Sequence, residues 1–415
     1  MVPKLKLHEF IDIKHGFAFS SDFFRDKATD YILLTPGNFH VDQRLYFGQR
    51  TKYYDGPIPN GYVLKNGDLL VVMTDLTKDM AILGNAVLLN SDKLVLHNQR
   101  IGLVQIKDEV RVEKRFLCAL LNSDIVQKYV RATASGTTVR HTAPKRILEI
   151  PAHIPPLPEQ RKIADILSTW DRAIETSEAL LATARTQKRA LMQSLLSGKG
   201  RFSEFGEHTG HSNKVPKGWD VLPLSSVCDV KGGKRIPKGQ SLSEAPTSHP
   251  YIRVSDMRDG YVDTSDIRYV PDEIAPSISR YRISKDDLFI SVAGTLGLVG
   301  KIQPELDGAN LTENADKLTN ISIDREFLLT VLQSPWVQRP IQNEKTSNAQ
   351  PKLALERIRG FRIPVPSLPE QRKIAAVLTD CQHEIEKLKL QIVKLRTEKK
   401  ALMQQLLTGK RRVNV

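Results

Sequence analysis

The chain contains the same stretch twice, and this repeat limits its fold more than any other feature. LPEQRKIA occurs at 157–164 and again at 368–375, an offset of 368 − 157 = 211 residues. The same offset relates ALMQ at 190–193 to ALMQ at 401–404. A solenoid is excluded because its units repeat every ~20–50 residues. The sequence therefore predicts two similar modules and a pseudo-two-fold molecule.

The likeness between the two modules is uneven. At the same offset, Phe116 matches Phe327 and Gln127 matches Gln338, but further upstream the likeness fades and the register drifts. The upstream correspondences that we expect are Leu7, Asp12 and Lys14 with Leu224, Asp229 and Lys231, Asp68-Leu69 with Asp287-Leu288, and Asn98 with Asn314. Each module is therefore a variable globular part followed by a near-identical helical part.

This pattern predicts five segments. They are a first globular head at 1–150, a first helical segment at 151–199, a linker at 200–216, a second head at 217–362 and a second helical segment at 363–412. The linker is assigned from its glycine, serine, histidine and asparagine content.

Proline and glycine mark the ends of the helical segments. Pro158 and Pro369 suit the first turn of a helix, where a missing N–H costs nothing. Gly198 and Gly409, each 40 residues further on, suit left-handed C-caps. At 1.5 Å per residue each segment predicts a helix of about 60 Å.

Apolar residues recur along both segments in steps of four and three, with Ser177, Lys188 and Lys399 as polar interruptions. The stripe comprises Ile163, Leu167, Trp170, Ile174, Leu181, Ala184, Leu191 and Leu195, and in the second segment Ile374, Leu378, Cys381, Ile385, Leu388, Ile392, Leu395, Leu402 and Leu406. A mean step of 3.5 is typical of a coiled coil. We expect the two helices to pack on each other, antiparallel. A pair of ordinary core helices and an intermolecular zipper are the alternatives.

The polar residues of LPEQRKIA are identical in both copies, and we expect them on largely solvent-facing positions. They are Glu159, Gln160, Arg161 and Lys162 in the first copy and Glu370, Gln371, Arg372 and Lys373 in the second. Two equal surfaces would allow two copies of a partner to dock, one on each repeat. The alternative is a well-capped helix start that the duplication preserved.

The heads are expected to be α+β. Residues 68–73 and 287–292 are typical of buried strands, and short helices are expected at 116–129 and 327–338. Each helix leads to a loop rich in small polar and basic residues, at 134–141 and 346–352 respectively.

Composition favours a polyanionic partner. The formal net charge is +14 and the sequence pI is about 9.5. Lysine and arginine release counterions when they bind nucleic acid. Charge alone is also compatible with a solubility charge or a membrane-surface protein. The chain has no apolar run long enough to span a membrane and no signal-like start, and its three cysteines are far apart, so we expect a cytoplasmic protein.

Loop residues with amide, hydroxyl or basic side chains are the candidates for DNA contact, because such groups read base edges or bind phosphates. Lys231, Lys234, Arg235 and Lys238 form a cluster that suits phosphate. The candidates are Lys14, His15, Thr74, Lys78, Asn98, Arg100, Thr137, Thr138, Arg140, Lys145, Lys231, Lys234, Arg235, Lys238, Arg253, Arg258, Thr295, Asn314, Lys317, Asn348, Gln350 and Lys352. A solvated surface charge is the alternative for any one of them.

No catalytic motif is present in the sequence. It contains neither the Asn/Asp-Pro-Pro-aromatic motif of adenine and cytosine methyltransferases nor a P-loop, HExxH or paired CxxC. His208 and His211 are three residues apart, but they lie in the linker. We therefore expect no catalytic residue, no metal site and no cofactor in this chain.

The chain resembles the specificity subunits of type I restriction–modification enzymes. The likeness rests on the doubled LPEQRKIA, the helix ends at 190–199 and 401–410, and the stretches VKGGKRIPKG at 230–239, YIRVSDMRDGYVD at 251–263 and NAQPKLALERIRGFRIPVP at 348–366. The first head departs more from the family pattern, for example in IDIKHGFAF at 11–19.

The resemblance implies two target recognition domains separated by two antiparallel helices. Each domain would read one half of a bipartite site on double-stranded DNA, and the helices would set the gap. Two modification subunits would bind the chain and methylate adenine with S-adenosylmethionine. Restriction subunits would add ATP- and Mg-dependent translocation and cleavage, and the specificity subunit itself would hold no catalytic site.

Three other classes remain as alternatives. A methyltransferase or nuclease acting alone is disfavoured by the missing motifs, and a coiled-coil scaffold without a DNA role is disfavoured by the positive charge. A solitary DNA-binding regulator would be separated by its gene neighbourhood, because a specificity subunit is expected beside a methyltransferase gene.

Overall fold

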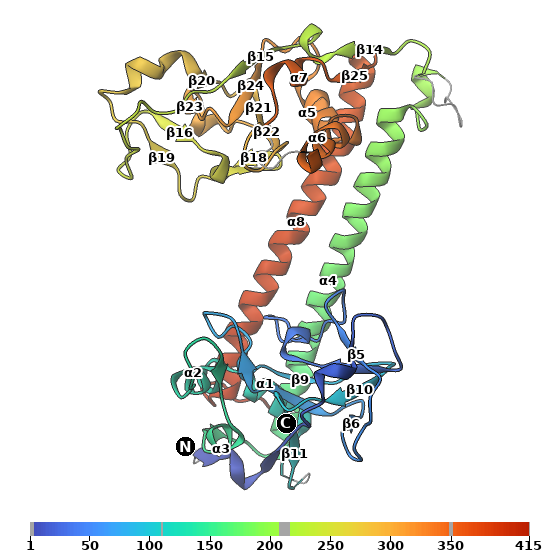
Figure 1. The fold of residues 1–415 in the computed structure, drawn as a ribbon, viewed down its shortest axis with the longest axis vertical. Helices are drawn as coiled ribbons and strands as arrows, with labels where there is room; N and C mark the ends of the chain where they lie inside the picture. The colour runs from blue at the N-terminus through green and yellow to red at the C-terminus, as the bar shows by residue number, and fades with distance from the viewer. Residues whose placement is uncertain (1–3, 109–110, 207–215, 348–351, 415) are drawn as a thin grey trace. The chain divides into compact units, whose positions relative to one another are not determined.

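The computed structural model describes residues 4–108, 111–206, 216–347 and 352–414 (Figure 1). The chain divides into two compact units. Unit 1 is Met1–Glu178 with Leu390–Val415, and unit 2 is Ala179–Lys389. Each unit contains one globular head and about half of each long helix. Head 1 denotes the elements from β1 to β13, and head 2 those from β14 to β25.

Head 1 is built on two sheets. The first has the order β2-β11-β7-β9, with β2 (Ile11–His15), β7 (Leu69–Val72), β9 (Ala86–Leu88) and β11 (Ile101–Ile106). The second has the order β3-β5-β4-β10-β6, with β3 (Phe24–Arg25), β4 (Tyr31–Leu34), β5 (Lys52–Tyr54), β6 (Val63–Leu64) and β10 (Leu94–His97). The remaining elements are the pairs β1 (Lys4–Lys6) with β13 (Pro151–His153) and β8 (Thr74–Asp75) with β12 (Arg140–His141), and helices α1 (Lys114–Leu121), α2 (Asp124–Ala132) and α3 (Pro144–Leu148).

Head 2 repeats the topology of the two main sheets. Its first sheet has the order β15-β24-β21-β22, with β15 (Asp229–Gly232), β21 (Leu288–Ser291), β22 (Val299–Lys301) and β24 (Ala315–Thr319). Its second has the order β19-β16-β23-β20, with β16 (Pro250–Ile252), β19 (Arg268–Tyr269), β20 (Arg282–Ile283) and β23 (Ala309–Leu311). The remaining elements are the pairs β14 (Asp220–Pro223) with β25 (Arg362–Val365) and β17 (Met257–Arg258) with β18 (Tyr261–Val262), and helices α5 (Arg325–Gln333), α6 (Pro335–Ser347) and α7 (Leu355–Arg359).

The duplication therefore extends through the heads, although their sequences have diverged. In both second sheets the one parallel pair occupies the same place, β4 with β10 in head 1 and β16 with β23 in head 2. Head 1 adds the edge strand β3. The expected α+β class is confirmed, and so is the internal duplication.

The two predicted buried strands are β7 and β21, and each lies between two hydrophobic layers. Leu69 packs in the core that contains the helices of head 1, whereas Leu70 packs in the core of the second sheet. Leu288 and Phe289 divide in the same way between the two cores of head 2. In unit 2 the helices lie beside the long helices and the second sheet lies away from them (Figure 1).

The prediction of a single helix at 116–129 and at 327–338 is wrong, because each of these stretches forms two helices, α1 and α2 in head 1 and α5 and α6 in head 2. Helix α1 ends at Leu121, and the Ser123 hydroxyl accepts from the Val126 N–H to start α2. In head 2, Pro335 begins α6 directly after Ser334. A serine that forms an N-cap, and a proline at the first helical position, end one helix and start the next.

Two helices of the predicted length are present, α4 (Leu157–Ser197) and α8 (Leu368–Leu407). Gly198 and Gly409 follow them with φ values of +71° and +69°, which confirms the left-handed caps. Each long helix begins in one unit and ends in the other.

The helices pair within the chain and run antiparallel in each unit. In unit 1, Ile163 near the start of α4 shares a core with Leu406 near the end of α8. In unit 2, Ile374 near the start of α8 shares a core with Leu195 near the end of α4. Leu191 departs from the predicted stripe, because it is exposed while the adjacent Met192 is buried.

Candidate nucleic-acid interface

A close structural match between the heads lies where β2 and β15 end. A Cβ on Gly16 would stand 2.1 Å from the carbonyl oxygen of Asn98, and one on Gly233 would stand 2.1 Å from that of Thr312. The next residue donates its N–H in both heads, Phe17 to the His97 carbonyl and Lys234 to Leu311, each at 2.8 Å. Only glycine permits such a close approach of two backbones. We call these regions the crossing of head 1 and the crossing of head 2.

These contacts correct one expected correspondence. Asn98 matches Thr312, and not Asn314, because each carbonyl faces the crossing glycine. Arg100 matches Asn314, since their carbonyls accept from the N–H groups of Met73 and Val292, at 3.0 and 2.7 Å. Asn98 and Asn314 therefore share a residue type but occupy different backbone positions in the two heads.

Two candidates in head 1 are buried and form hydrogen bonds within the head. Asn98 is only 6% exposed, and its Oδ1 accepts from the Arg100 N–H at 3.1 Å. Thr74 is 5% exposed, and its hydroxyl lies 3.1 Å from Nδ1 of His141. Both side chains are therefore engaged within the head in this structure, and their place among the candidates for DNA contact stays a prediction.

The loop before α3 presents two of the candidates openly. Ser135 and His141 exchange two backbone hydrogen bonds of 2.9 Å, so the loop is a closed hairpin. The Arg140 guanidinium donates to the Gly136 carbonyl at 2.6 Å and so stabilises the turn. Thr137 and Thr138 are exposed at the tip. The hairpin offers two hydroxyl groups on a fixed backbone.

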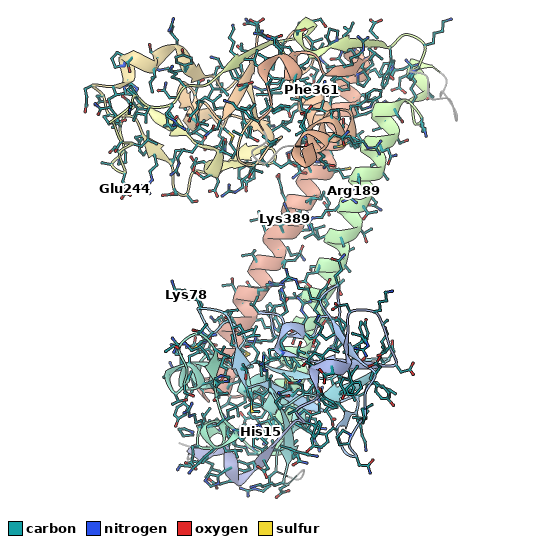
Figure 2. The ribbon with its side chains drawn as sticks, in the orientation of Figure 1. His15, Lys78, Arg189, Glu244, Phe361 and Lys389 are labelled. Atoms are coloured by element: carbon teal, nitrogen blue, oxygen red, sulfur yellow. The ribbon has the colours of Figure 1, made fainter. Side chains whose placement is uncertain are left out.

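Asp75 is a structural residue that the sequence did not reveal. It is fully buried, and its carboxylate accepts from the N–H groups of Thr77, Ile82 and Leu83 at 2.6–3.0 Å. These bonds order the loop that carries the exposed Lys78. Figure 2 shows Lys78 and His15 well apart on head 1, so the candidates of this head do not form one patch.

The other exposed candidates for DNA contact lie on several elements. They are His15, Arg100 and Lys145 in head 1 and Lys238, Thr295 and Lys352 in head 2, while Lys14 and Asn314 are half-buried. Lys14 donates to the Gly61 carbonyl at 3.2 Å and lies 4.6 Å from the centre of the Tyr62 ring. Asn348 and Gln350 lie outside the described residues.

Many of the basic candidates in head 2 are paired with acids. Arg253 binds Asp256 and Asp266 at 2.6 and 3.1 Å, and Arg258 binds Asp263 at 2.9 Å. Lys231 binds Asp229 at 3.0 Å, and Arg235 binds Glu313 at 2.5 Å. The positive charge of this head is therefore partly neutralised, and its unpaired lysines matter more than its total charge.

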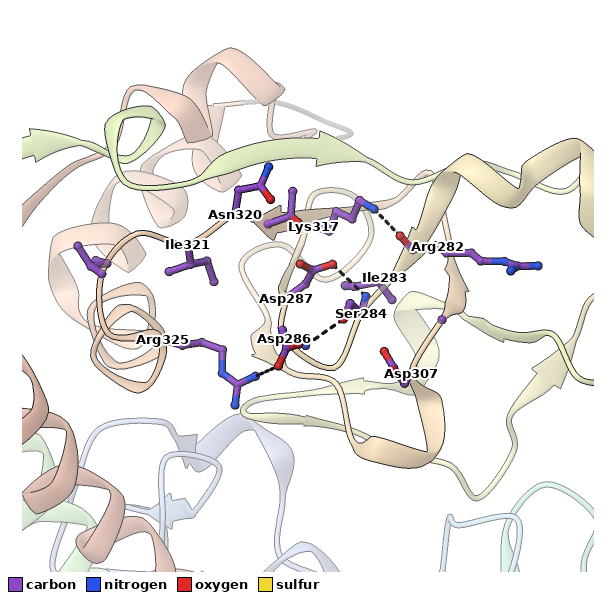
Figure 3. A pocket seen from close by; sticks show the side chains of 13 residues that line it. Arg282, Ile283, Ser284, Asp286, Asp287, Asp307, Lys317, Asn320, Ile321 and Arg325 are labelled. Atoms are coloured by element: carbon purple, nitrogen blue, oxygen red, sulfur yellow. Dashed lines mark hydrogen bonds and ion pairs between the residues drawn. The ribbon is translucent and has the colours of Figure 1, made fainter.

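Lys317 lies in a separate pocket (Figure 3). It donates to the Arg282 carbonyl and faces the turn in which Asp287 accepts from the Ser284 N–H at 2.9 Å. The pocket is also lined by Asp307 and Arg325. Because Asp287 precedes β21, the pocket lies at the end of that strand opposite to the crossing of head 2. Lys317 is therefore not brought together with Lys234 and Arg235.

Four of the eight expected docking residues are buried, so the expectation that they face solvent is wrong for them. Gln160 accepts from the Glu113 N–H at 2.9 Å and donates to the Pro155 carbonyl at 2.8 Å. Gln371 accepts from the Asp324 N–H at 2.9 Å and donates to Pro366 at 2.8 Å. Each glutamine ties the start of a long helix to the start of the first helix of its head.

The glutamates of the motif bind the chain beyond the end of the other helix. Glu159 accepts from Arg412 at 2.6 and 2.7 Å, and Glu370 accepts from Arg201 at 2.9 and 3.0 Å. The offset is preserved, because 412 − 201 = 211. The four remaining residues, Arg161, Lys162, Arg372 and Lys373, are exposed.

Asp316 is a buried carboxylate in head 2 at a place where head 1 has Gly102. Its Oδ2 has no hydrogen-bond partner among the described residues. Burial raises the pKa of Asp316 to about 6, while Lys352 and Arg359 act in the opposite direction. The folded state therefore holds the proton more tightly than the unfolded state between pH 3.8 and about 6, and stability is lost as the pH rises through that window.

We expect Asp316→Asn to raise the free energy of unfolding by about 2–3 kcal/mol at pH 8, because asparagine keeps the shape and cannot ionise. The gain should disappear below about pH 4, where aspartate is protonated in both states. Urea unfolding of both proteins at pH 4 and pH 8 measures this. An equal difference at the two pH values would contradict the assignment.

The described residues hold no cluster of three or more histidine, cysteine, aspartate or glutamate side chains that could bind a metal. Within the same ranges, no helix combines the length and the apolar character that crossing a membrane requires. Burial raises the pKa of the Cys118 and Cys228 thiols to about 12, so neither is a thiolate at neutral pH.

The chain thus consists of two related α+β heads, each followed by a long helix. The family model of the type I restriction modification DNA specificity domain matches the chain twice, at residues 3–184 and 216–395. The chain therefore belongs to the family of type I restriction–modification DNA specificity proteins, as its resemblance predicted. Each match covers one head and the first part of the helix that follows it.

Individual relatives agree with this family. The EcoBI specificity subunit of Escherichia coli is 23% identical over 386 residues, which cover 89% of this chain and 77% of that protein. The MjaVIII specificity subunit of Methanocaldococcus jannaschii is 23% identical over 293 residues, with coverages of 69% and 68%.

Solved structures support the fold over the whole chain. The S subunit of a type I restriction–modification system from M. genitalium has a TM-score of 0.60 at 18% identity, covering 98% of this chain and 99% of that one. A second structure, from work on assembly and conformational transition of a type I system, has a TM-score of 0.58 at 19% identity, with coverages of 99% and 100%.

Proposed function

We propose that this chain is the DNA-recognition subunit of a type I restriction–modification complex and that each head reads one half of a bipartite site. One observation carries the proposal: the two heads share a strand topology and a glycine crossing, yet they differ in the side chains beside it. Phe17 and Ala18 follow the crossing glycine in head 1, whereas Lys234 and Arg235 follow it in head 2. A common frame with different side chains suits two different half-sites.

The helices α4 and α8 would set the gap between the half-sites and dock two adenine-methyltransferase subunits. Arg161, Lys162, Arg372 and Lys373 are the docking candidates, because they are exposed and occur once in each repeat. S-adenosylmethionine would belong to the modification subunits, and ATP and Mg to the restriction subunits. This chain would contribute recognition without catalysis, in the cytoplasm. The segment boundaries 1–150, 151–199, 200–216, 217–362 and 363–412 belong to the same proposal.

Co-expression with a modification subunit from the same gene cluster, followed by mapping of methylated adenines on genomic DNA, tests this function. We expect one split motif with a fixed gap. Exchanging residues 1–150 for the head of a relative should change one half of the motif and leave the other half and the gap unchanged. The unexchanged complex is the control for motif and yield.

Two results would contradict the proposal. A complex that methylates a continuous motif would remove the assignment of one head to each half-site. A chain that forms no complex, and binds DNA with an affinity independent of salt, would favour a scaffold, because phosphate contacts make DNA binding depend strongly on salt.

A further inference from the structure

The segment that follows the crossing of head 2 is held on a fixed backbone. Lys234 donates its N–H to Leu311 at 2.8 Å, and its carbonyl accepts from the hydroxyl of Tyr251 at 2.9 Å. Tyr251 is only 4% exposed and belongs to a hydrophobic cluster against which Ile236 also packs. The backbone on either side of Arg235 is therefore anchored, although the Arg235 side chain itself points into solvent.

Arg235 is exposed but oriented. Its side chain is 73% exposed, and its Nε donates to Oε1 of Glu313 at 2.5 Å. Glu313 is mostly buried, and its other oxygen accepts from the Thr312 hydroxyl at 3.1 Å. Burial alone would raise the pKa of Glu313, but the hydrogen bond from Arg235 and its other bonds lower it, so the carboxylate is charged. The two terminal nitrogens of Arg235 have no hydrogen-bond partner among the described residues.

This geometry suits a base edge better than a phosphate. Two free, coplanar N–H donors match the O6 and N7 acceptors that guanine presents in the major groove. The nearby Glu313 carboxylate cancels much of the positive charge of the Arg235 guanidinium. It would also repel a phosphate that approached this guanidinium. Holding the guanidinium from its Nε side also reduces the side-chain entropy lost on binding.

The matching position in head 1 has different chemistry. Ala18 stands where head 2 has Arg235, and Phe17 stands where head 2 has Lys234. Phe17 is 37% exposed and packs against Tyr62, with ring centres 5.4 Å apart. Head 1 therefore presents an aromatic ring at the position where head 2 presents Lys234, and no guanidinium at the position of Arg235.

We propose that Arg235, oriented by Glu313, recognises a guanine in the half-site read by head 2. This inference rests on the proposed function. Arg235 is the residue that contacts the base, and Glu313 is a positioning residue. Lys238 is exposed on the same segment and has no acidic partner among the described residues. It is therefore the matched control, a cation that we expect to contact phosphate and not a base.

The test uses the complex with its modification subunit and four variants: Arg235→Ala, Arg235→Lys, Glu313→Gln and Lys238→Ala. Exchange of residues 1–150 first identifies which half-site belongs to head 2. Binding is then measured on duplexes in which each base pair of that half-site is replaced in turn. Unfolding midpoints of the variants confirm that head 2 remains folded.

We expect a G·C pair in this half-site and a loss of discrimination at that pair of about 5- to 150-fold in Arg235→Ala. Arg235→Lys should lose part of the discrimination, because the donors of lysine rotate on a single nitrogen and form no fixed, coplanar pair. Glu313→Gln should relax the same pair to a smaller extent. Lys238→Ala should weaken all duplexes equally and reduce the salt dependence of binding.

Other results would overturn the inference in distinguishable ways. If the half-site of head 2 contains no G·C pair, or if Arg235→Ala weakens all duplexes equally, Arg235 does not read guanine, while the proposed function stands. If the unmodified complex produces no split motif, the proposed function fails and the role of Arg235 fails with it.

Discussion

Glu370→Ala is expected to lower the free energy of unfolding of unit 2 by about 3–5 kcal/mol, the usual cost of removing one partner from a buried ion pair. Arg201 is only 8% exposed along its side chain, and it would lose the carboxylate that binds two of its nitrogens. The buried indole of Trp219 would also lose its acceptor, because Nε1 donates to the same carboxylate at 3.1 Å. Two buried side chains would thus lose the same acceptor at once.

Glu159→Ala is the matched control, since the duplication places the same ion pair in unit 1. There Arg412 is 54% exposed, so its guanidinium can return to water. We expect a loss of about 1 kcal/mol, as for pairs with one solvated partner. Urea unfolding followed by tryptophan fluorescence measures both variants. Equal losses would show that the burial of the arginine does not decide the effect.

The long helices could be predicted from sequence because their signals are local. Pro158 and Gly198 mark the ends of α4, and apolar residues with a mean spacing of 3.5 residues define its buried face. The role of Gln160 could not be predicted in this way, because its partners are backbone groups of Arg111, Glu113 and Pro155. Identity between the two copies is compatible with a docking surface and with a helix start that the duplication preserved; for Glu159 and Gln160 the structure shows internal contacts.

The heads were harder to predict because their pairings are non-local. β4 pairs in parallel with β10, sixty or so residues later in the chain, and no local pattern fixes such a contact. Residue type alone places Asn98 and Thr74 among the candidates for DNA contact, but both side chains are buried and form hydrogen bonds within the head. The crossing glycines were accessible to sequence, since Gly16 and Gly233 keep the offset of Lys14 and Lys231.

Gly233→Ala is expected to destabilise unit 2 by about 3–4 kcal/mol, at or above the upper end of the usual range for overpacking. The new Cβ would stand 2.1 Å from the Thr312 oxygen and 2.4 Å from that of Leu311. Both obstacles are backbone atoms, so the strain cannot be relieved by rotation of a side chain. Relief requires the chain at Lys234 and Arg235 to move, and we therefore also expect recognition of one half-site to be lost.

Gly232→Ala, one residue earlier, is the control. Its Cβ would lie 3.5 Å from Oδ1 of Asp316, an ordinary van der Waals contact. We expect little change in the unfolding free energy or in the methylated motif. If both variants behave alike, the close approach of the two backbones at the crossing does not organise head 2. If only Gly233→Ala loses a half-site, while the other half is still read, the crossing fixes the reading residues of that head alone. Gly16→Ala should then affect the opposite half-site, because the same clash with a backbone oxygen occurs in head 1.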